Sequence, residues 1–118
     1  MSLARELGVS GEEAAVRFLQ KKRFNIIRRG FRFHRGEIDI IAYDRETLVF
    51  VEVKTRRNLE CGLPEEAVTP AKQEQIRKIA EAFLAVSHLE QVPCRFDILS
   101  LLRDSEGGFR VRHIRDAF

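Results

Sequence analysis

Two apolar segments that flank a short polar turn restrict the possible folds of this chain more than any other feature. Residues 37–43 and 48–55 are rich in Ile, Val, Phe and Leu, and Asp44-Arg45-Glu46-Thr47 separates them. Apolar runs joined in this way are typical of a β-hairpin. We expect the turn to pair Tyr43 with Leu48, which sets the register of the whole hairpin.

That register brings two acidic side chains together. Asp39 falls opposite Glu52, and directly opposed Cβ atoms lie about 4.5–5.5 Å apart. Glu37 falls opposite Lys54 in the same way. Because side chains alternate between the two faces of a strand, we expect these four to share one face, with Ile38, Ile40 and Ala42 on the other.

Two opposed carboxylates need a partner, since one of them would otherwise hold its proton near neutral pH. A divalent cation removes the conflict, and Mg²⁺ or Mn²⁺ prefers carboxylates, waters and phosphate oxygens. Lys54 could then orient the attacking water or stabilise charge on the phosphate. The pattern therefore indicates a metal site of Asp39 and Glu52 with an ammonium group beside it.

A second interpretation of the same spacing is the solvated face of an antiparallel sheet, with Glu37 and Lys54 as a surface pair. The apolar neighbours Ile41, Phe50 and Val53 argue against it, because they indicate a strand buried on both sides. From spacing alone the two interpretations stand about even.

Two helices are expected around the hairpin. Ser10 with Glu13 predicts a capping box that opens a helix over residues 10–22. Thr69 is a good N-cap for a second helix over residues 70–87. Both apolar stripes end in polar residues at the helix starts: Glu12 in the first helix, Lys72 and Gln73 in the second. An inward lysine suits a bound phosphate, because a cation alone is disfavoured at the positive end of a helix.

The remaining patterns complete an αβββαββ order in one domain of residues 1–118, an α/β fold with a mixed central sheet flanked by two helices. The other strands are expected at residues 24–33, 95–102 and 109–114, with an irregular stretch at 56–68. Asp97, among apolar residues, is predicted to be a buried carboxylate with a structural hydrogen bond. His34 is predicted to be an ordinary exposed histidine.

Charge is unevenly distributed along the chain. Residues 1–58 hold 13 Lys and Arg against 8 Asp and Glu, an excess that attracts polyanions, nucleic acid above all.

No stretch approaches the ~20 apolar residues of a membrane span, and no signal peptide is recognisable, so a cytoplasmic protein without a membrane partner is expected. Cys61 and Cys94 lie too far apart for a zinc motif, and two reduced, partly buried thiols are expected.

The segment Gly36-Glu37-Ile38-Asp39, followed after about a dozen residues by Val51-Glu52-Val53-Lys54-Thr55-Arg56, resembles the PD-(D/E)xK motif of restriction-endonuclease-like nucleases. More narrowly, most of the chain resembles the YraN-like family of small bacterial proteins regarded as endonucleases. The resemblance implies a restriction-endonuclease-like core, related in form to archaeal Holliday-junction resolvases.

The resemblance also implies roles for individual residues. Asp39 and Glu52 would ligate Mg²⁺ or Mn²⁺ with the backbone carbonyl of Val53, Lys54 would assist the water, and Glu12 would lie near the metal. Glu37 and Gln73 are secondary candidates. The candidate nucleic-acid-binding residues are Arg29, Arg32, Arg35, Arg56 and Lys72.

Three functions are compatible with these patterns. The leading hypothesis is a metal-dependent endonuclease that acts on DNA, including branched or damaged forms, and a homodimer is compatible with it because related nucleases often pair to cut both strands. The second is a nucleic-acid-binding module with this fold and little catalysis. The third is an interaction protein that uses an apolar edge of the sheet. No groove-reading element separates DNA from RNA.

Overall fold

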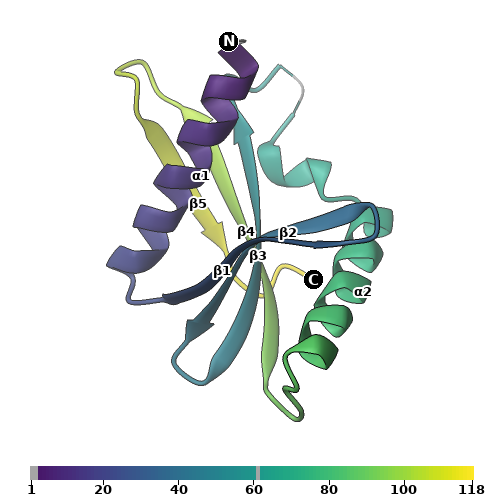
Figure 1. The fold of residues 1–118 in the computed structure, drawn as a ribbon. Helices are drawn as coiled ribbons and strands as arrows, with labels where there is room; N and C mark the ends of the chain where they lie inside the picture. Colours follow the sequence, from purple (N-terminus) through teal and green to yellow (C-terminus); the bar gives the residue numbers. More distant parts are fainter. Residues whose placement is uncertain (1–2, 61) are drawn as a thin grey trace.

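The chain forms a five-stranded mixed β-sheet with one long helix on each face (Figure 1). The computed structural model describes the backbone of residues 3–60 and 62–118, and the side chains of residues 11–60 and 62–118. Its elements, in chain order, are α1 (Leu3–Lys21), β1 (Asn25–Phe33), β2 (Gly36–Asp44), β3 (Thr47–Arg56), η1 (Pro64–Ala67), α2 (Pro70–Val86), β4 (Cys94–Arg103) and β5 (Phe109–Ile114). The predicted order of helices and strands is confirmed.

The strands lie in the sheet in their sequence order, β1-β2-β3-β4-β5. Only the β3–β4 pair of this sheet is parallel, and the other neighbours are antiparallel. A parallel connection needs a long crossover, which η1 and α2 supply. The β2–β3 hairpin pairs Tyr43 with Leu48 as predicted, and Arg45 takes the left-handed conformation (φ 58°) that its tight turn needs.

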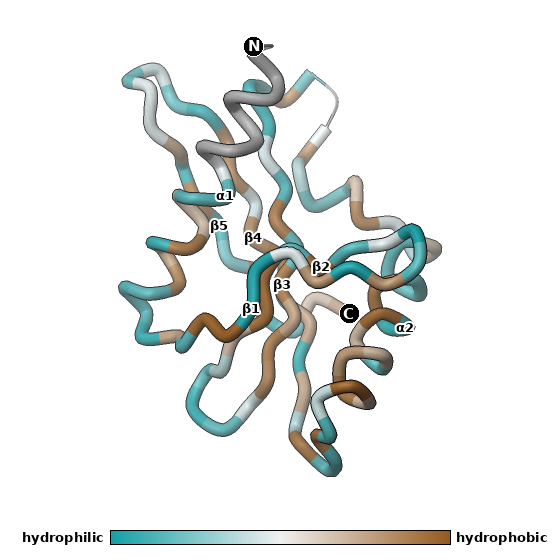
Figure 2. Tube along the Cα trace, in the orientation of Figure 1, coloured by the Kyte–Doolittle hydropathy of each residue, from teal (hydrophilic) through white to brown (hydrophobic). Residues whose placement is uncertain are grey.

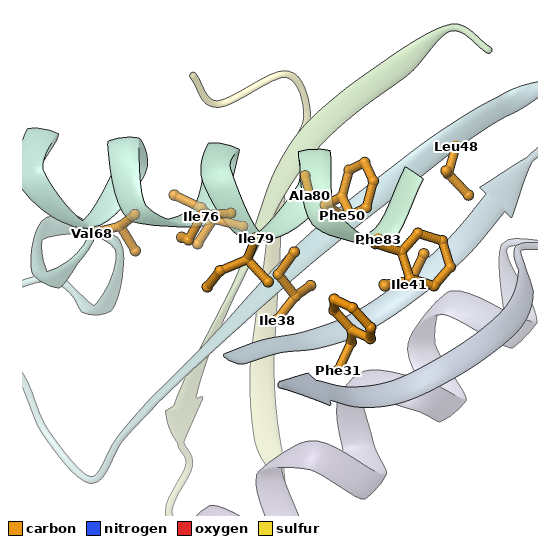
Figure 3. Packing of buried hydrophobic residues seen from close by; sticks show 11 residues of the cluster. Phe31, Ile38, Ile41, Leu48, Phe50, Val68, Ile76, Ile79, Ala80 and Phe83 are labelled. Carbon is orange, nitrogen blue, oxygen red and sulfur yellow. The ribbon is translucent and has the colours of Figure 1, made fainter. Parts of the chain in front are cut away.

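Each helix covers its own apolar cluster on the sheet. On the α2 face, Ile76, Ile79, Ala80 and Phe83 point toward the strands (Figure 3). On the other face, Ala15, Val16 and Leu19 of α1 pack on a second set of strand residues. Figure 2 shows apolar segments along the strands, whereas the turns that join β2 to β3 and β4 to β5 are hydrophilic. Burial on both faces explains why β3 is continuously apolar from Leu48 to Val51.

The alternation of side chains breaks at Asp39 in β2. Ile38 packs in the α2 cluster, whereas Ile40 and Ala42 pack in the α1 cluster. The predicted common face of these three residues is therefore wrong. Between the Arg29–Ile40 and Phe31–Ile38 pairs of β1 and β2 lies Gly30 of β1, whose φ of 68° distorts the ladder beside Asp39.

Helix α1 begins at Leu3, earlier than predicted. The expected capping box at Ser10 is wrong, because Ser10 lies inside the helix rather than at its start. Strong helix formers such as Ala4 and Leu7 precede it and extend the helix. The second helix begins as predicted, with the Thr69 hydroxyl accepting a hydrogen bond from the Lys72 amide (3.3 Å).

None of the helices in the described part of the chain has the length and apolar character that crossing a membrane requires.

Gly11 allows α1 to approach β3 closely. A Cβ atom built at Gly11 would overlap the Thr55 side chain, including its Cβ at 3.2 Å. We expect Gly11→Ala to lower the free energy of unfolding by about 1 kcal/mol, because overpacking of roughly 1–3 kcal/mol outweighs the gain in helix propensity of about 1 kcal/mol. Urea unfolding of Gly11→Ala, Thr55→Ala and the double variant measures this effect. A double variant whose loss equals the sum of the single losses would contradict the contact.

Candidate metal centre

The candidate site lies where β2 and β3 separate. Their pairing ends at Ile40–Val51. Beyond this pair β3 continues along β4, while residues 36–38 of β2 pair with β1. Asp39 reaches across this opening, and its Oδ2 accepts a hydrogen bond from the Val53 amide (2.8 Å). A carboxylate thus replaces the missing ladder contact and is fixed at the fork of the sheet.

Asp39 is the centre of an acidic cluster. Its carboxylate and those of Glu12 and Glu37 each place an oxygen within 4.8 Å of the other two, and all three residues are partly buried. Burial, followed by the charge of Asp39, raises the pKa of Glu12. Three carboxylates from α1 and β2 are therefore held together at a cost that a cation would relieve.

Glu52 approaches Asp39 from β3. Its residue is only 5% exposed; burial and then the hydrogen bond and charge of Asp39 raise its pKa to about 9, against the opposing effect of Lys54 and Lys72. Its Oε2 is buried and has no hydrogen-bond partner among the residues whose side chains the structure describes. Unpartnered buried carboxylate oxygens are costly, and a divalent cation is a partner that this donor set fits.

The structure changes the predicted pairing around this site. Asp39 and Glu52 meet through their side chains rather than as an opposed ladder pair. Glu37 is not opposite Lys54: it pairs with Arg32 across β1 and forms an ion pair with it (2.9 Å). The reason is the fork, which ends the β2–β3 register before it reaches these positions.

Two lysines accompany Glu52. Lys54 follows it on β3, and Lys72 lies near the start of α2; both are partly buried, and the charges of both lower the pKa of Glu52. The charge of Lys72 therefore reaches Glu52, and the binding of a phosphate by this lysine stays a prediction. Gln73 is engaged elsewhere, because its side-chain amide donates to the carbonyl oxygen of Val68 (3.1 Å).

The predicted basic residues surround the acidic cluster unevenly. Arg29 contacts Glu13 (3.0 Å) and lowers the pKa of Glu12 through its charge. Arg35 is exposed at the β1–β2 turn. Arg56 donates to the carbonyl oxygen of Thr55 (3.0 Å) at the end of β3. These positions place cationic groups on β1, at the β1–β2 turn and at the end of β3.

Asp97 is a structural residue, as predicted. It is fully buried, accepts hydrogen bonds from the Arg95 guanidinium (2.9 and 3.0 Å) and the Asp116 amide, and shares one with His113 (2.7 Å). Burial alone would raise its pKa, but these contacts prevail and lower the pKa to about 2. All of its acceptor capacity is used within the protein, in contrast to Glu52.

Of the two cysteines, the structure describes Cys94. Cys61 lies outside the described residues. Cys94 is exposed rather than partly buried, at the first position of β4, where its thiol donates to the Val92 carbonyl oxygen (3.3 Å).

Sequence reasoning underestimated Glu37. Its spacing from Asp39 placed both residues on one side of β2, but the third carboxylate comes from α1, and its position depends on how that helix packs. That carboxylate belongs to Glu12, which was expected near the metal, and the close approach of α1 to β3 at Gly11 brings it there.

The comparisons with known proteins identify a single family. The model of the family described as "Uncharacterised protein family UPF0102" matches residues 11–101. Proteins named UPF0102 are 49% identical over 118 residues in Prosthecochloris aestuarii (96% of this chain, 93% of the relative) and 47% identical over 114 residues in Geotalea uraniireducens (97% and 90%). A third, from Symbiobacterium thermophilum, is 47% identical over 116 residues, with 98% of each chain covered.

Proposed function

The chain belongs to the UPF0102 family, and from the acidic fork we propose that it is a divalent-metal-dependent endonuclease that hydrolyses phosphodiester bonds in DNA. The observation that carries the proposal is the Glu52 carboxyl, buried beside Asp39 with an oxygen to which no described residue forms a hydrogen bond. The proposal includes a restriction-endonuclease-like core with the PD-(D/E)xK motif, for which the five-stranded mixed sheet and the two helices give coarse support.

In this proposal Asp39 and Glu52 would hold the metal, and Glu12 and Glu37 would add negative charge beside it. Bound Mg²⁺ or Mn²⁺ supplies a water of lowered pKa and polarises the phosphoryl group. The Val53 amide orients Asp39 through the hydrogen bond at 2.8 Å. The Val53 carbonyl is a further candidate ligand.

The lysines supply the opposite charge. Lys54 lies near Glu52, where its ammonium group can orient the attacking water or stabilise charge that develops on the phosphate. Lys72 approaches from the N-terminal turn of α2, a position that favours an anion. Arg29, Arg35 and Arg56 would hold the flanking phosphates of the strand, and Arg32, whose Nε donates to Glu37, would do so with its other N–H groups.

A cleavage experiment tests the proposal. Wild-type protein is incubated with end-labelled duplex, bulged and branched DNA in Mg²⁺, Mn²⁺ or EDTA. We expect cleavage only with metal, and a loss of at least about 10²-fold in Asp39→Asn, because this variant keeps the size of the side chain and removes a ligand charge. Glu74→Gln, an exposed carboxylate of α2, is the matched control.

Two results would decide against the proposal. Equal cleavage by wild type and Asp39→Asn would show that the activity comes from elsewhere. Salt-sensitive DNA binding without cleavage under any metal condition would identify a binding module instead, and in that case Glu52→Gln should bind DNA as tightly as wild type or more tightly, since it leaves the basic residues that contact the phosphates in place and removes a group that can become negatively charged.

A further inference from the structure

The β1–β2 turn forms one wall of a small pocket against α2. The pocket has a volume of about 370 Å³, near the lower end of the roughly 300–1,000 Å³ typical of ligand sites. The residues that line it are Phe33, His34, Arg35, Gly36, Gln75, Lys78 and Ile79. Figure 1 shows this turn beside α2, on the opposite side of the sheet from α1. We call this cavity the turn pocket.

The walls of the turn pocket are suited to a flat aromatic group. Phe33 is 39% exposed although it is a large apolar residue, and its ring meets that of His34 at a centroid distance of 4.2 Å and an angle of 69°. Ile79 supplies an apolar floor. Exposed aromatic rings offer stacking surfaces for nucleobases, whatever the base.

The charges of the turn pocket point to the same class of ligand. Arg35 and Lys78 are exposed at its rim, and no carboxylate is among its described lining residues. Gln75 adds an amide that can donate to and accept from a base edge. Two cations beside an apolar, aromatic recess complement a base together with its phosphates.

The absence of a side chain at Gly36 joins this pocket to the acidic fork. A Cβ at Gly36 would press on Ile79 and come within 3.0 Å of the Gln75 amide nitrogen. The next residue, Glu37, belongs to the acidic cluster, and consecutive Cα atoms are only about 3.8 Å apart. The turn pocket and the acidic cluster are therefore neighbours along β2, and one nucleic-acid strand that crosses this end of β2 would present a base to the first and a phosphate to the second.

We propose that the turn pocket binds one unpaired nucleobase of the nucleic acid that is cut at the acidic fork. The proposal rests on the proposed function and specifies its substrate class. A base inside a continuous duplex must be unstacked and unpaired before it enters such a recess, which costs free energy, whereas a base that is already unpaired avoids most of this cost. The preferred substrate is therefore DNA with an unpaired nucleotide next to the scissile bond, as in a bulge, a branch or a single-stranded junction.

Fluorescence and cleavage together test this assignment. The probe is a duplex with one bulged 2-aminopurine, compared with the same duplex without the bulge, and binding is measured in EDTA before Mg²⁺ is added. We expect tighter binding of the bulged duplex and a fluorescence change as the base stacks on the protein. Phe33→Leu should reduce the preference for the bulge about tenfold and leave cleavage of the continuous duplex unchanged.

Ile27→Ala is the matched control, because Ile27 is also on β1 and similarly exposed (41%); we expect it to keep the preference. If wild type binds and cleaves both duplexes equally, the turn pocket does not bind an unpaired base, whereas the nuclease proposal still stands. If wild type binds the bulged duplex preferentially, Phe33→Leu loses this preference and no cleavage occurs, base binding in the turn pocket is supported and the nuclease proposal is overturned. An equal loss in Phe33→Leu and Ile27→Ala would also overturn base binding in the turn pocket.

Discussion

Lys54→Met is expected to lower the rate of metal-dependent DNA cleavage about 10³-fold while the affinity for Mn²⁺ changes little. Lys54 is partly buried and close enough to Glu52 to lower the pKa of that carboxyl through its charge. Removal of one preorganised group that stabilises transition-state charge typically costs about 10²–10³ in rate, and in a site partly shielded from water the loss should reach the upper end. Met keeps the apolar stem, so the packing of β3 is retained.

The cleavage rate and the affinity for Mn²⁺, measured together, should show whether Lys54 acts on the phosphate or through the metal ligands. Single-turnover cleavage gives the rate, and Mn²⁺ titration gives the affinity. Lys21→Met removes a charge at the last turn of α1, about nine residues or roughly 13 Å along the helix from Glu12, and should cut as wild type does. If Lys54→Met weakens Mn²⁺ binding in proportion to the rate, the lysine acts by organising the metal ligands, and a direct role at the phosphate is ruled out.

The sequence predicted the hairpin, the second helix and the two central carboxylates because each depends on local rules. The Tyr43–Leu48 pair follows from turn length, and the α2 start follows from Thr69 as N-cap. Asp39 and Glu52 meet because the hairpin brings their strands together.

The fork between β2 and β3 was not predictable in the same way. A strict period of two placed Glu37 opposite Lys54, but pairing stops after Ile40–Val51. The competition between β1 and β3 for the end of β2 decides this point, and such competition depends on non-local contacts and on the positive φ of Gly30. The acidic cluster therefore includes a member from α1 that periodicity within β2 and β3 could not supply.

The turn pocket illustrates the same limit. Phe33 and His34 are adjacent in sequence, and an exposed histidine was expected. What makes the recess is Gly36, whose missing side chain lets β2 approach Ile79 and Gln75 of α2. A contact between residues about 40 positions apart is a property of the packed fold, and no local pattern reports it.

Glu52→Gln is expected to stabilise the metal-free protein at neutral and alkaline pH. The folded-state pKa of Glu52 is raised from 4.5 to about 9, so the folded protein holds a proton that the unfolded chain has released. Stability therefore falls as the pH rises from about 4.5 to 9, at a cost on the order of 3 kcal/mol at pH 7. Gln removes this cost because it carries no ionisable group.

The expected gain corresponds to a rise in Tm on the order of 10 °C for a domain of this size, measured by thermal unfolding in EDTA at pH 5 and at pH 8. The difference between variant and wild type should be small at pH 5 and large at pH 8. Glu13→Gln, an exposed carboxylate of α1 paired with Arg29, should shift stability by less than about 1 kcal/mol at either pH.

Added Mn²⁺ should reverse the order of stability. Metal that binds only the folded state stabilises wild type by about 3 kcal/mol at a hundredfold excess over Kd, whereas Glu52→Gln lacks a charged ligand and should respond weakly. The same carboxyl would then destabilise the empty protein and stabilise the loaded one, as expected of a metal ligand and not of a structural acid such as Asp97. A lower Tm for Glu52→Gln in EDTA at pH 8 would contradict this account, because it would mean that the Glu52 carboxylate is already satisfied by the protein itself.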